Sequence, residues 1–122
     1  MGGFERYIEE VRKFEHSLMF KKKFEDFVEL IKLFGGSGIQ SWAIESRLKI
    51  SGAFVRALVK YARRKGHLIC SNKTGYFYGI PEQAQETIHH MTERVSSILY
   101  TVKCMEEKIE KYIPEFIVNY NI

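Results

Sequence analysis

The sequence predicts a mostly helical protein with one small β-hairpin, and two patterns lead to this prediction. Apolar residues recur every three or four positions through most of the 122 residues, which is the period of an amphipathic helix. Between residues 68 and 80 this period gives way to two short apolar runs separated by the turn sequence NKTG, which is typical of a hairpin. A chain of this length favours a single domain, residues 1–122, with one modest core.

The first third of the chain predicts two helices, or one sharply bent helix. An apolar stripe at alternating spacings of three and four is formed by Phe4, Tyr7, Val11, Phe14 and Leu18. The pattern slips out of phase near residues 17–22 and resumes at Phe20, Phe24, Phe27, Ile31 and Phe34. Gly35 and Gly36 then end the helical segment, because glycine commonly follows a helix C-terminus.

Two shorter helices are expected before the hairpin. Ile39 is interpreted as a brief extended piece, and Ser41 as the N-cap of a short helix that buries Ile44 and Leu48. Ser51 caps the next helix, which runs from Gly52 to Lys65 and is closed by Gly66. The inward face of this second helix is Val55, Leu58, Val59 and Ala62.

A long helix is expected after the hairpin, opened by Pro81 at its first turn. The apolar spacing then alternates four and three over four heptads: Ala84, Ile88, Met91, Val95, Ile98, Val102, Met105, Ile109 and Tyr112. About 30 residues of helix span about 45 Å, which is more than a core of this size needs. Pro114 is expected to end the helix. The organisation is therefore an N-terminal helix (1–19), a central unit (20–80), a long helix (81–113) and an apolar tail (114–122).

Charge is segregated along the chain. Residues 46–81 contain eight Lys or Arg and no Asp or Glu, whereas the rest has eleven bases and fifteen acids. A basic middle between acidic flanks is typical of a surface that binds a polyanion, and a merely solvated basic surface is the alternative.

Residues 39–80 combine a short helix, the tight turn Lys49–Ser51, a helix and a hairpin. In this order they resemble the winged helix-turn-helix of the biotin repressor's DNA-binding domain, and those of small phage- and prophage-encoded DNA-binding proteins. The residues that carry the resemblance are Ile44, Leu48, Ile50, Ser51, Val55, Arg56, Val59, Arg63 or Arg64, Gly66, Ile69, Gly75 and Tyr76. It covers about a third of the chain and implies that helix 51–65 lies in the major groove of duplex DNA, with the hairpin 68–80 as the wing.

The expected DNA contacts come from three places. The outward stripe of helix 51–65 brings small residues and Arg56 and Lys60 toward base edges or phosphates. Helix starts offer backbone N–H groups for phosphate, and the wing tip reaches an adjacent groove. For the basic cluster at the helix end, a simple C-terminal cap is the alternative to phosphate contact. The predicted DNA-binding set is Ser41, Ser51, Gly52, Ala53, Arg56, Lys60, Arg63, Arg64 and Lys73.

The other notable side chains receive structural interpretations. Trp42, Tyr76 and Tyr78 are assigned to packing, and His67 to a solvent or phosphate contact. His89 and His90 point about 100° apart on a helix and are interpreted as surface residues. We recognise no catalytic or metal-binding arrangement, so an enzyme, a metal and a cofactor are not expected.

The two terminal helices are expected to form a homodimer, and their packing on each other within one chain is the alternative. The dimerisation residues would be Phe4, Tyr7, Val11, Phe14, Ile88, Met91, Val95, Ile98, Val102, Met105 and Ile109. Two recognition helices would then enter successive major grooves, with half-sites about 34 Å apart. Methionines in the seam leave parallel and antiparallel pairing both open.

The sequence therefore predicts a homodimeric transcriptional regulator that binds double-stranded DNA sequence-specifically. The alternatives are a phage-type replication or packaging accessory protein and a winged helix whose basic face binds an acidic protein. Cys70 and Cys104 are interpreted as reduced thiols, and no signal peptide or membrane span is recognised. We therefore expect a cytoplasmic protein without a membrane partner or a small-molecule ligand.

Overall fold

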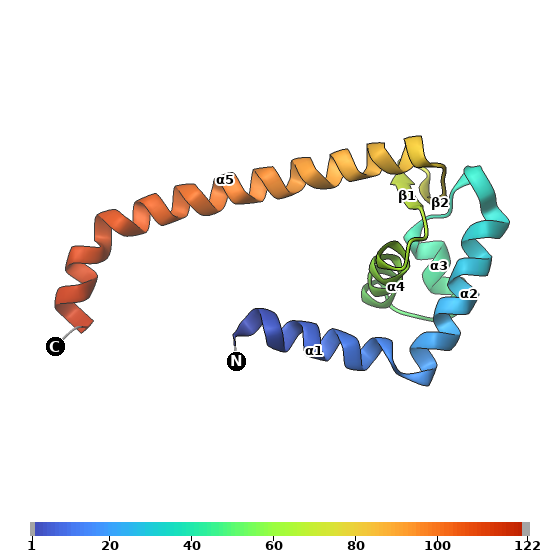
Figure 1. The fold of residues 1–122 in the computed structure, drawn as a ribbon, viewed down its shortest axis with the longest axis horizontal. Helices are drawn as coiled ribbons and strands as arrows, with labels where there is room; N and C mark the ends of the chain where they lie inside the picture. Colours follow the sequence, from blue (N-terminus) through green and yellow to red (C-terminus); the bar gives the residue numbers. More distant parts are fainter. Residues whose placement is uncertain (1, 121–122) are drawn as a thin grey trace. The chain divides into compact units, whose positions relative to one another are not determined.

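A computed structural model describes the backbone of residues 2–120 and the side chains of residues 2–112. Its elements are α1 (Gly3–Glu15), α2 (Leu18–Phe34), the 3-10 turn η1 (Gly35–Ser37), α3 (Ser41–Leu48), α4 (Gly52–Arg64), β1 (Ile69–Asn72), β2 (Gly75–Tyr78) and α5 (Pro81–Tyr120) (Figure 1). The prediction of a mostly helical protein with one small hairpin is confirmed. The chain divides into two compact units, Met1–Thr87 and Ile88–Ile122.

The break between α1 and α2 is a capped helix start. Ser17 has an extended backbone, and its side-chain oxygen accepts a hydrogen bond from the Phe20 N–H at 3.1 Å. This bond satisfies one of the N–H groups that a helix N-terminus leaves without a partner. The first third of the chain is therefore two helices, and the phase slip in its apolar pattern marks the boundary.

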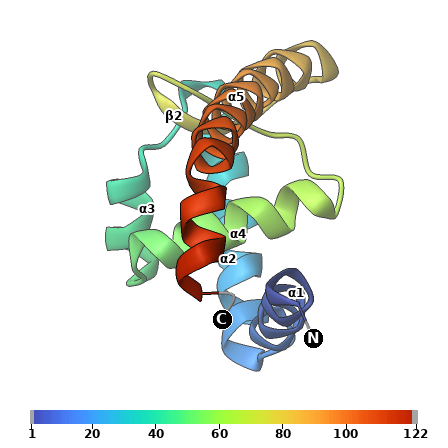
Figure 2. The same cartoon turned by 90° about the vertical axis from the view of Figure 1, so that its left-hand side faces the viewer.

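The core of the first unit lies between α2, α3 and α4. Side chains of all three helices bury almost completely: Phe20, Phe27, Ile31, Ile44, Val55, Leu58, Val59 and Ala62. The predicted inward face of α4 is confirmed residue by residue. Ile39 and Ile69 extend the same core toward the hairpin. Figure 2 shows α3 and α4 crossing at a steep angle, as two helices joined by a tight turn do.

The turn between α3 and α4 is fixed by local hydrogen bonds. Lys49 takes a left-handed conformation with φ of 56°, and the Ile50 N–H donates to the Glu45 carbonyl at 3.1 Å. Lys23 reaches across from α2 and donates to the Leu48 carbonyl at 2.6 Å. Ser51 is the N-cap of α4, as predicted, and accepts from the Phe54 N–H.

The predicted cap of α3 is wrong by one residue. Gln40 occupies the N-cap position without a side-chain capping bond, and α3 begins at Ser41. The Ser41 hydroxyl donates instead to the Glu45 carboxylate at 3.1 Å, one turn further along the helix. A serine and a carboxylate four residues apart lie on the same side of a helix, which allows this bond.

The hairpin pairs β1 and β2 antiparallel, with Ile69 opposite Tyr78 and Asn72 opposite Gly75. Lys73 and Thr74 form its tip. Ile39 adds one further bridge through two backbone hydrogen bonds to Tyr76, which confirms the extended piece predicted there. Gly75 has φ of 114°, a backbone conformation that residues other than glycine rarely adopt.

Helix α5 starts against the hairpin and is longer than expected. Pro81 occupies its first position, and the buried Thr87 hydroxyl accepts a hydrogen bond from the Ser71 N–H at 3.4 Å. The helix continues through Pro114 to Tyr120, so the expected end at Pro114 is corrected. A proline inside a helix removes one backbone hydrogen bond and usually bends the helix rather than stopping it.

Candidate nucleic-acid interface

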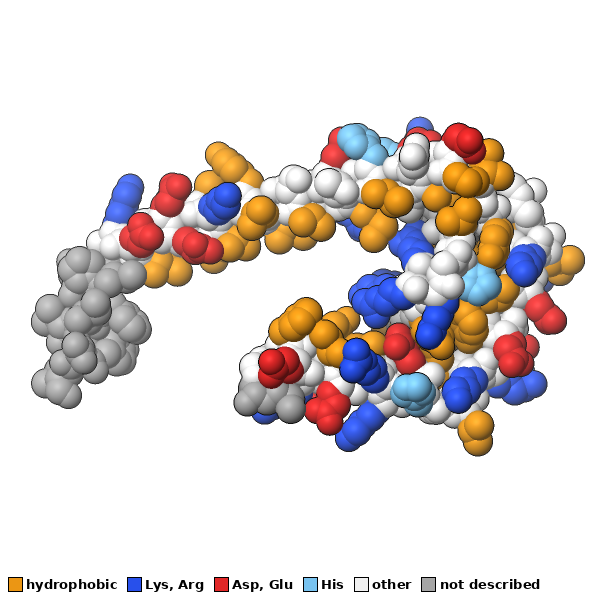
Figure 3. All heavy atoms as spheres, viewed as in Figure 1, with side chains coloured by type: hydrophobic (Ala, Val, Ile, Leu, Met, Phe, Trp, Pro, Cys, Tyr) orange, Lys and Arg blue, Asp and Glu red, His pale blue; other side chains and the backbone are white. Residues whose placement is uncertain are grey.

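One side of α4 is exposed and basic, and we call it the outer face of α4. It comprises Ala53, Arg56, Ala57, Lys60 and Arg64, all exposed except the partly buried Ala57. The apolar side of α4 packs into the core, and these five residues lie on the opposite side of the helix. Core packing therefore determines which side chains of α4 are exposed to solvent. Helix α4 contains no acidic residue. Figure 3 shows Lys and Arg side chains gathered around this helix.

The side chains at the start of α3 and α4 lie close to one carboxylate. Glu45 accepts the Ser41 hydroxyl, and a Cβ added at Gly52 would stand 3.5 Å from the same Glu45 carboxylate. A carboxylate repels phosphate at this distance, so two of the predicted phosphate contacts, Ser41 and Gly52, lie in an unfavourable field. The Ser51 hydroxyl accepts the capping bond from the Phe54 N–H, and its own hydrogen can still be donated to a phosphate.

Arg63 lies apart from the outer face, although it was predicted to belong to the DNA-binding set. Its side chain is partly buried, and its Nε donates to the Ile69 carbonyl at 2.8 Å. Arg63 therefore joins the last turn of α4 to the first residue of β1. Arg64, one position later, points outward and remains on the basic surface.

Lys73 is exposed at the tip of the hairpin, and the backbone beneath it is held firmly. Gln40, which precedes α3, donates to the Lys73 carbonyl at 2.8 Å. On the other side of the tip, the Asn72 side chain accepts from the Thr74 N–H at 2.8 Å and from the Thr74 hydroxyl. The hairpin tip is therefore anchored to the start of α3.

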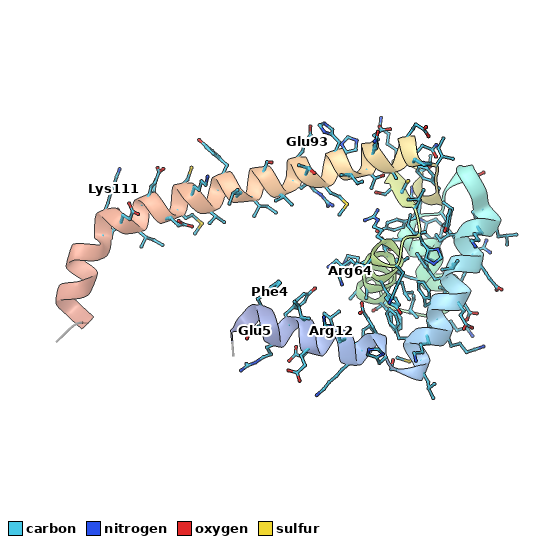
Figure 4. All side chains as sticks on the ribbon, in the orientation of Figure 1. Phe4, Glu5, Arg12, Arg64, Glu93 and Lys111 are labelled. Atoms are coloured by element: carbon cyan, nitrogen blue, oxygen red, sulfur yellow. The ribbon has the colours of Figure 1, made fainter. Side chains whose placement is uncertain are left out.

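Helix α1 lies beside the outer face of α4, which the sequence did not predict. A cleft of about 250 Å³ between the two helices is lined by Tyr7, Val11, Phe14 and Glu15 from α1 and by Ala53, Arg56, Ala57, Lys60 and Arg64 from α4. Glu15 stands 3.9 Å from the Arg64 guanidinium. Figure 4 labels Arg64 on α4 and Arg12 on α1. The stripe expected to meet a symmetry mate is thus turned in part toward α4, although Phe4 remains 75% exposed.

The end of α1 is attached through one aromatic side chain. The Phe14 ring makes edge contacts with Phe20 and Phe54, each at 5.1 Å between ring centres. None of the described residues of α1 is buried. The helix therefore rests on the core at its C-terminal end and leaves most of its surface in solvent.

Two aromatic residues differ from their sequence interpretation. Trp42 was assigned to packing but is 71% exposed at the second residue of α3, close in sequence to the exposed basic segment. His67 was assigned to solvent or phosphate, but its Nδ1 lies 2.7 Å from the Tyr78 hydroxyl and its ring packs against Phe24. The apolar spacing could not place either residue, because both lie outside the periodic stripes.

Two other kinds of site are absent from the part of the chain that the structure describes. Those residues contain no group of three His, Cys, Asp or Glu side chains able to hold a metal ion. Among them there is also no helix with the length and hydropathy of a membrane span. His89 forms a surface pair with Glu93 at 2.9 Å, one turn apart on α5.

Comparison with known proteins gives no match: no protein-family model, no curated protein and no solved structure matches this chain. We therefore infer the function from the residues and their geometry.

Proposed function

We propose that the protein binds double-stranded DNA through a winged helix-turn-helix formed by α3, α4 and the β1–β2 hairpin. The observation that carries the proposal is the outer face of α4, which presents three basic and two small side chains and no acid. Duplex DNA attracts such a surface through its phosphates, and a helix fits its major groove. Sequence-specific regulation of transcription by a homodimer in the cytoplasm is the role that we assign to this binding.

In the proposed complex, α4 lies in the major groove. Ala53 and Ala57 allow the helix to approach the base edges, while Arg56 and Lys60 reach guanine or a phosphate. Arg64 contacts the backbone near the end of the helix. Lys73, held by the rigid tip of the hairpin, reaches the neighbouring phosphates.

The proposed DNA-binding set differs from the predicted set. Ser41 and Gly52 are left out because they lie near the Glu45 carboxylate. Arg63 is left out because its Nε is committed to the Ile69 carbonyl. Trp42 is added because its exposed indole lies on the first turn of α3, the first helix of the helix-turn-helix. Indole rings are apolar with one N–H donor, and such side chains pack against sugars and donate to phosphates at protein–DNA interfaces.

Binding in this mode requires α1 to move. In the complex, the walls of the major groove, about 12 Å apart, lie on both sides of the helix. Helix α1 stands where one wall would be, because only a cleft of about 250 Å³ lies between α1 and the outer face of α4. The hinge is the two-residue break at His16 and Ser17. Only the form in which α1 has moved away from α4 is competent to bind DNA. The free energy needed to move α1 therefore makes the free energy of DNA binding less favourable by the same amount.

The proposal is tested by removing the basic side chains of the outer face. A variant with Arg56, Lys60 and Arg64 changed to Ala is compared with a control in which Lys21, Lys22 and Lys103 are changed to Ala. Both variants lose three positive charges, but only the first loses them from α4. At low salt, with a mixed 30-base-pair duplex, we expect the first variant to bind at least tenfold more weakly than the control.

Equal affinities of the two variants would contradict the proposal, because the loss would then follow net charge alone. Absence of binding by the unmodified chain at low salt would also contradict it. In that case the basic face would meet an acidic protein, and capture of such a partner would be sensitive to the same three substitutions.

A further inference from the structure

The described part of the second unit is a helix with one apolar side in solvent. Ile88, Val95, Ile98, Val102, Met105, Ile109 and Tyr112 are all exposed, with Val95 at 63% and Ile98 at 64%. We call these residues, together with Met91, the α5 seam. Figure 3 shows hydrophobic side chains following one another along this helix. A long helix obtains most of its stability from packing of its apolar side, and such a seam in water lacks that contribution.

The seam has the geometry of a coiled coil. Its members alternate at spacings of three and four over four heptads, so Ile88, Val95, Val102 and Ile109 occupy the a positions. Met91, Ile98, Met105 and Tyr112 occupy the d positions. Every a position is β-branched, as in two-stranded parallel coiled coils, although those combine such a positions with Leu at d and the d positions here are Met, Ile, Met and Tyr.

We propose that the α5 seam pairs with the α5 seam of a second copy of this chain, in parallel and in register. The proposal goes beyond DNA binding and does not depend on it. In this pairing each a residue meets the same residue of the second copy, so Ile meets Ile and Val meets Val. A second copy therefore supplies an apolar side chain opposite every member of the seam, and no layer from residue 88 to residue 112 is left with a polar partner.

The flanking charges are compatible with the parallel pairing. In a parallel pair a g residue faces the e residue five positions later on the other helix. Arg94 then faces Leu99 of the second copy, and Thr101 faces Glu106 of the second copy. No two like charges oppose each other between residues 88 and 112, and the stem of Arg94 can lie along the apolar Leu99.

The antiparallel alternative carries a cost. Full overlap of the seam pairs Ile88 with Tyr112 of the second copy, and the same alignment places Arg94 opposite Lys108 of the second copy. This like-charge pair occurs twice by symmetry. Sliding the helices by one heptad avoids the repulsion, but Ile109 and Tyr112 then lose their partners. Charge and apolar burial therefore favour the parallel arrangement.

The orientation is tested by disulfide trapping in the full chain with Cys104 changed to Ser; Cys70 is buried and stays. Val95→Cys places a thiol at an a position, where parallel helices bring the two copies together. In the antiparallel overlap the same thiols would be about 15 Å apart along the axis, from 1.5 Å per residue. A disulfide needs Cα atoms within about 7 Å. We expect Val95→Cys to form a covalent dimer under mild oxidation.

Ser97→Cys is the matched control, because it lies two residues away at an outward c position and should remain monomeric on a non-reducing gel. A mixture of Val95→Cys and Met105→Cys chains distinguishes the orientations further. Parallel pairing yields only the two homodimers, whereas a disulfide between residues 95 and 105 would overturn the proposal. The mass of the unmodified chain in solution is also measured at a concentration of about 100 µM, and a monomer mass there would overturn the proposal. DNA affinity is measured separately, so either proposal can fail alone.

Discussion

At the scale of the residue, the structure depends on a few positions where the backbone leaves the common conformations. Gly75 has a positive φ at the base of the hairpin tip, and its Cα faces the backbone of Ile39. Lys49 has a left-handed conformation between α3 and α4 without being a glycine. Both positions set the direction of a neighbouring segment, the hairpin in one case and α4 in the other.

Gly75→Ala is expected to lower the free energy of unfolding by about 2–3 kcal/mol. An alanine Cβ would overlap the Ile39 carbonyl oxygen and would be strained at this φ. Gly36→Ala is the control, because a Cβ there meets nothing within 4 Å and the φ of Gly36 is not positive. Urea denaturation measures both variants, and equal midpoints would contradict the role given to Gly75.

Lys49→Gly is expected to stabilise the protein by about 0.5–1 kcal/mol, because glycine relieves the left-handed strain at a helix C-terminus. The same replacement at Lys60, inside α4, should destabilise it by about 1 kcal/mol. Opposite signs for two Lys→Gly substitutions are an unambiguous result in thermal unfolding. A loss of stability at Lys49 would show that its side chain makes a contribution larger than the strain.

At the scale of the element, the periodic parts of the fold could be predicted and the aperiodic contacts could not. The inward face of α4 follows from the spacing of Val55, Leu58, Val59 and Ala62, and the Ser51 cap follows from residue type. The inward turn of Arg63 could not be predicted, since it depends on where the Ile69 carbonyl returns. The same holds for α1, whose apolar stripe is evident but whose neighbour is decided by tertiary packing.

The position of α1 beside the outer face of α4 leads to a prediction about affinity. Deletion of residues 2–12 removes Tyr7 and Val11 from the cleft but retains Phe14 and its contacts with Phe20 and Phe54. We expect the shortened chain to bind a mixed-sequence duplex at least threefold more tightly, because α1 no longer has to be displaced.

Glu10→Gln is the control for charge. The deleted segment has a net charge of −1, from Glu5, Glu9 and Glu10 against Arg6 and Arg12, and the substitution likewise removes one negative charge. Affinities are compared by fluorescence anisotropy after circular dichroism has shown that both variants are folded. If the shortened chain binds no more tightly than Glu10→Gln, α1 does not obstruct the DNA-binding surface.

At the scale of the whole molecule, the two units contain different kinds of surface, one basic and one apolar. The first unit contains the core and the basic face, while the described part of the second unit contains the exposed α5 seam. Pairing two copies through the seam would link two of the proposed DNA-binding faces, and linked sites bind more tightly than either site alone. Seam variants that prevent dimerisation should therefore weaken DNA binding while leaving the first unit folded.

The salt dependence of DNA binding tests the central claim most directly. The affinity for a 30-base-pair duplex is measured across a range of salt concentrations, for the unmodified chain and for the variant with Arg56, Lys60 and Arg64 changed to Ala. Each lost phosphate contact makes the logarithmic slope shallower by about 0.9, so we expect a difference of about 2–3. Identical slopes for the two proteins would contradict the assignment of the outer face of α4 to DNA.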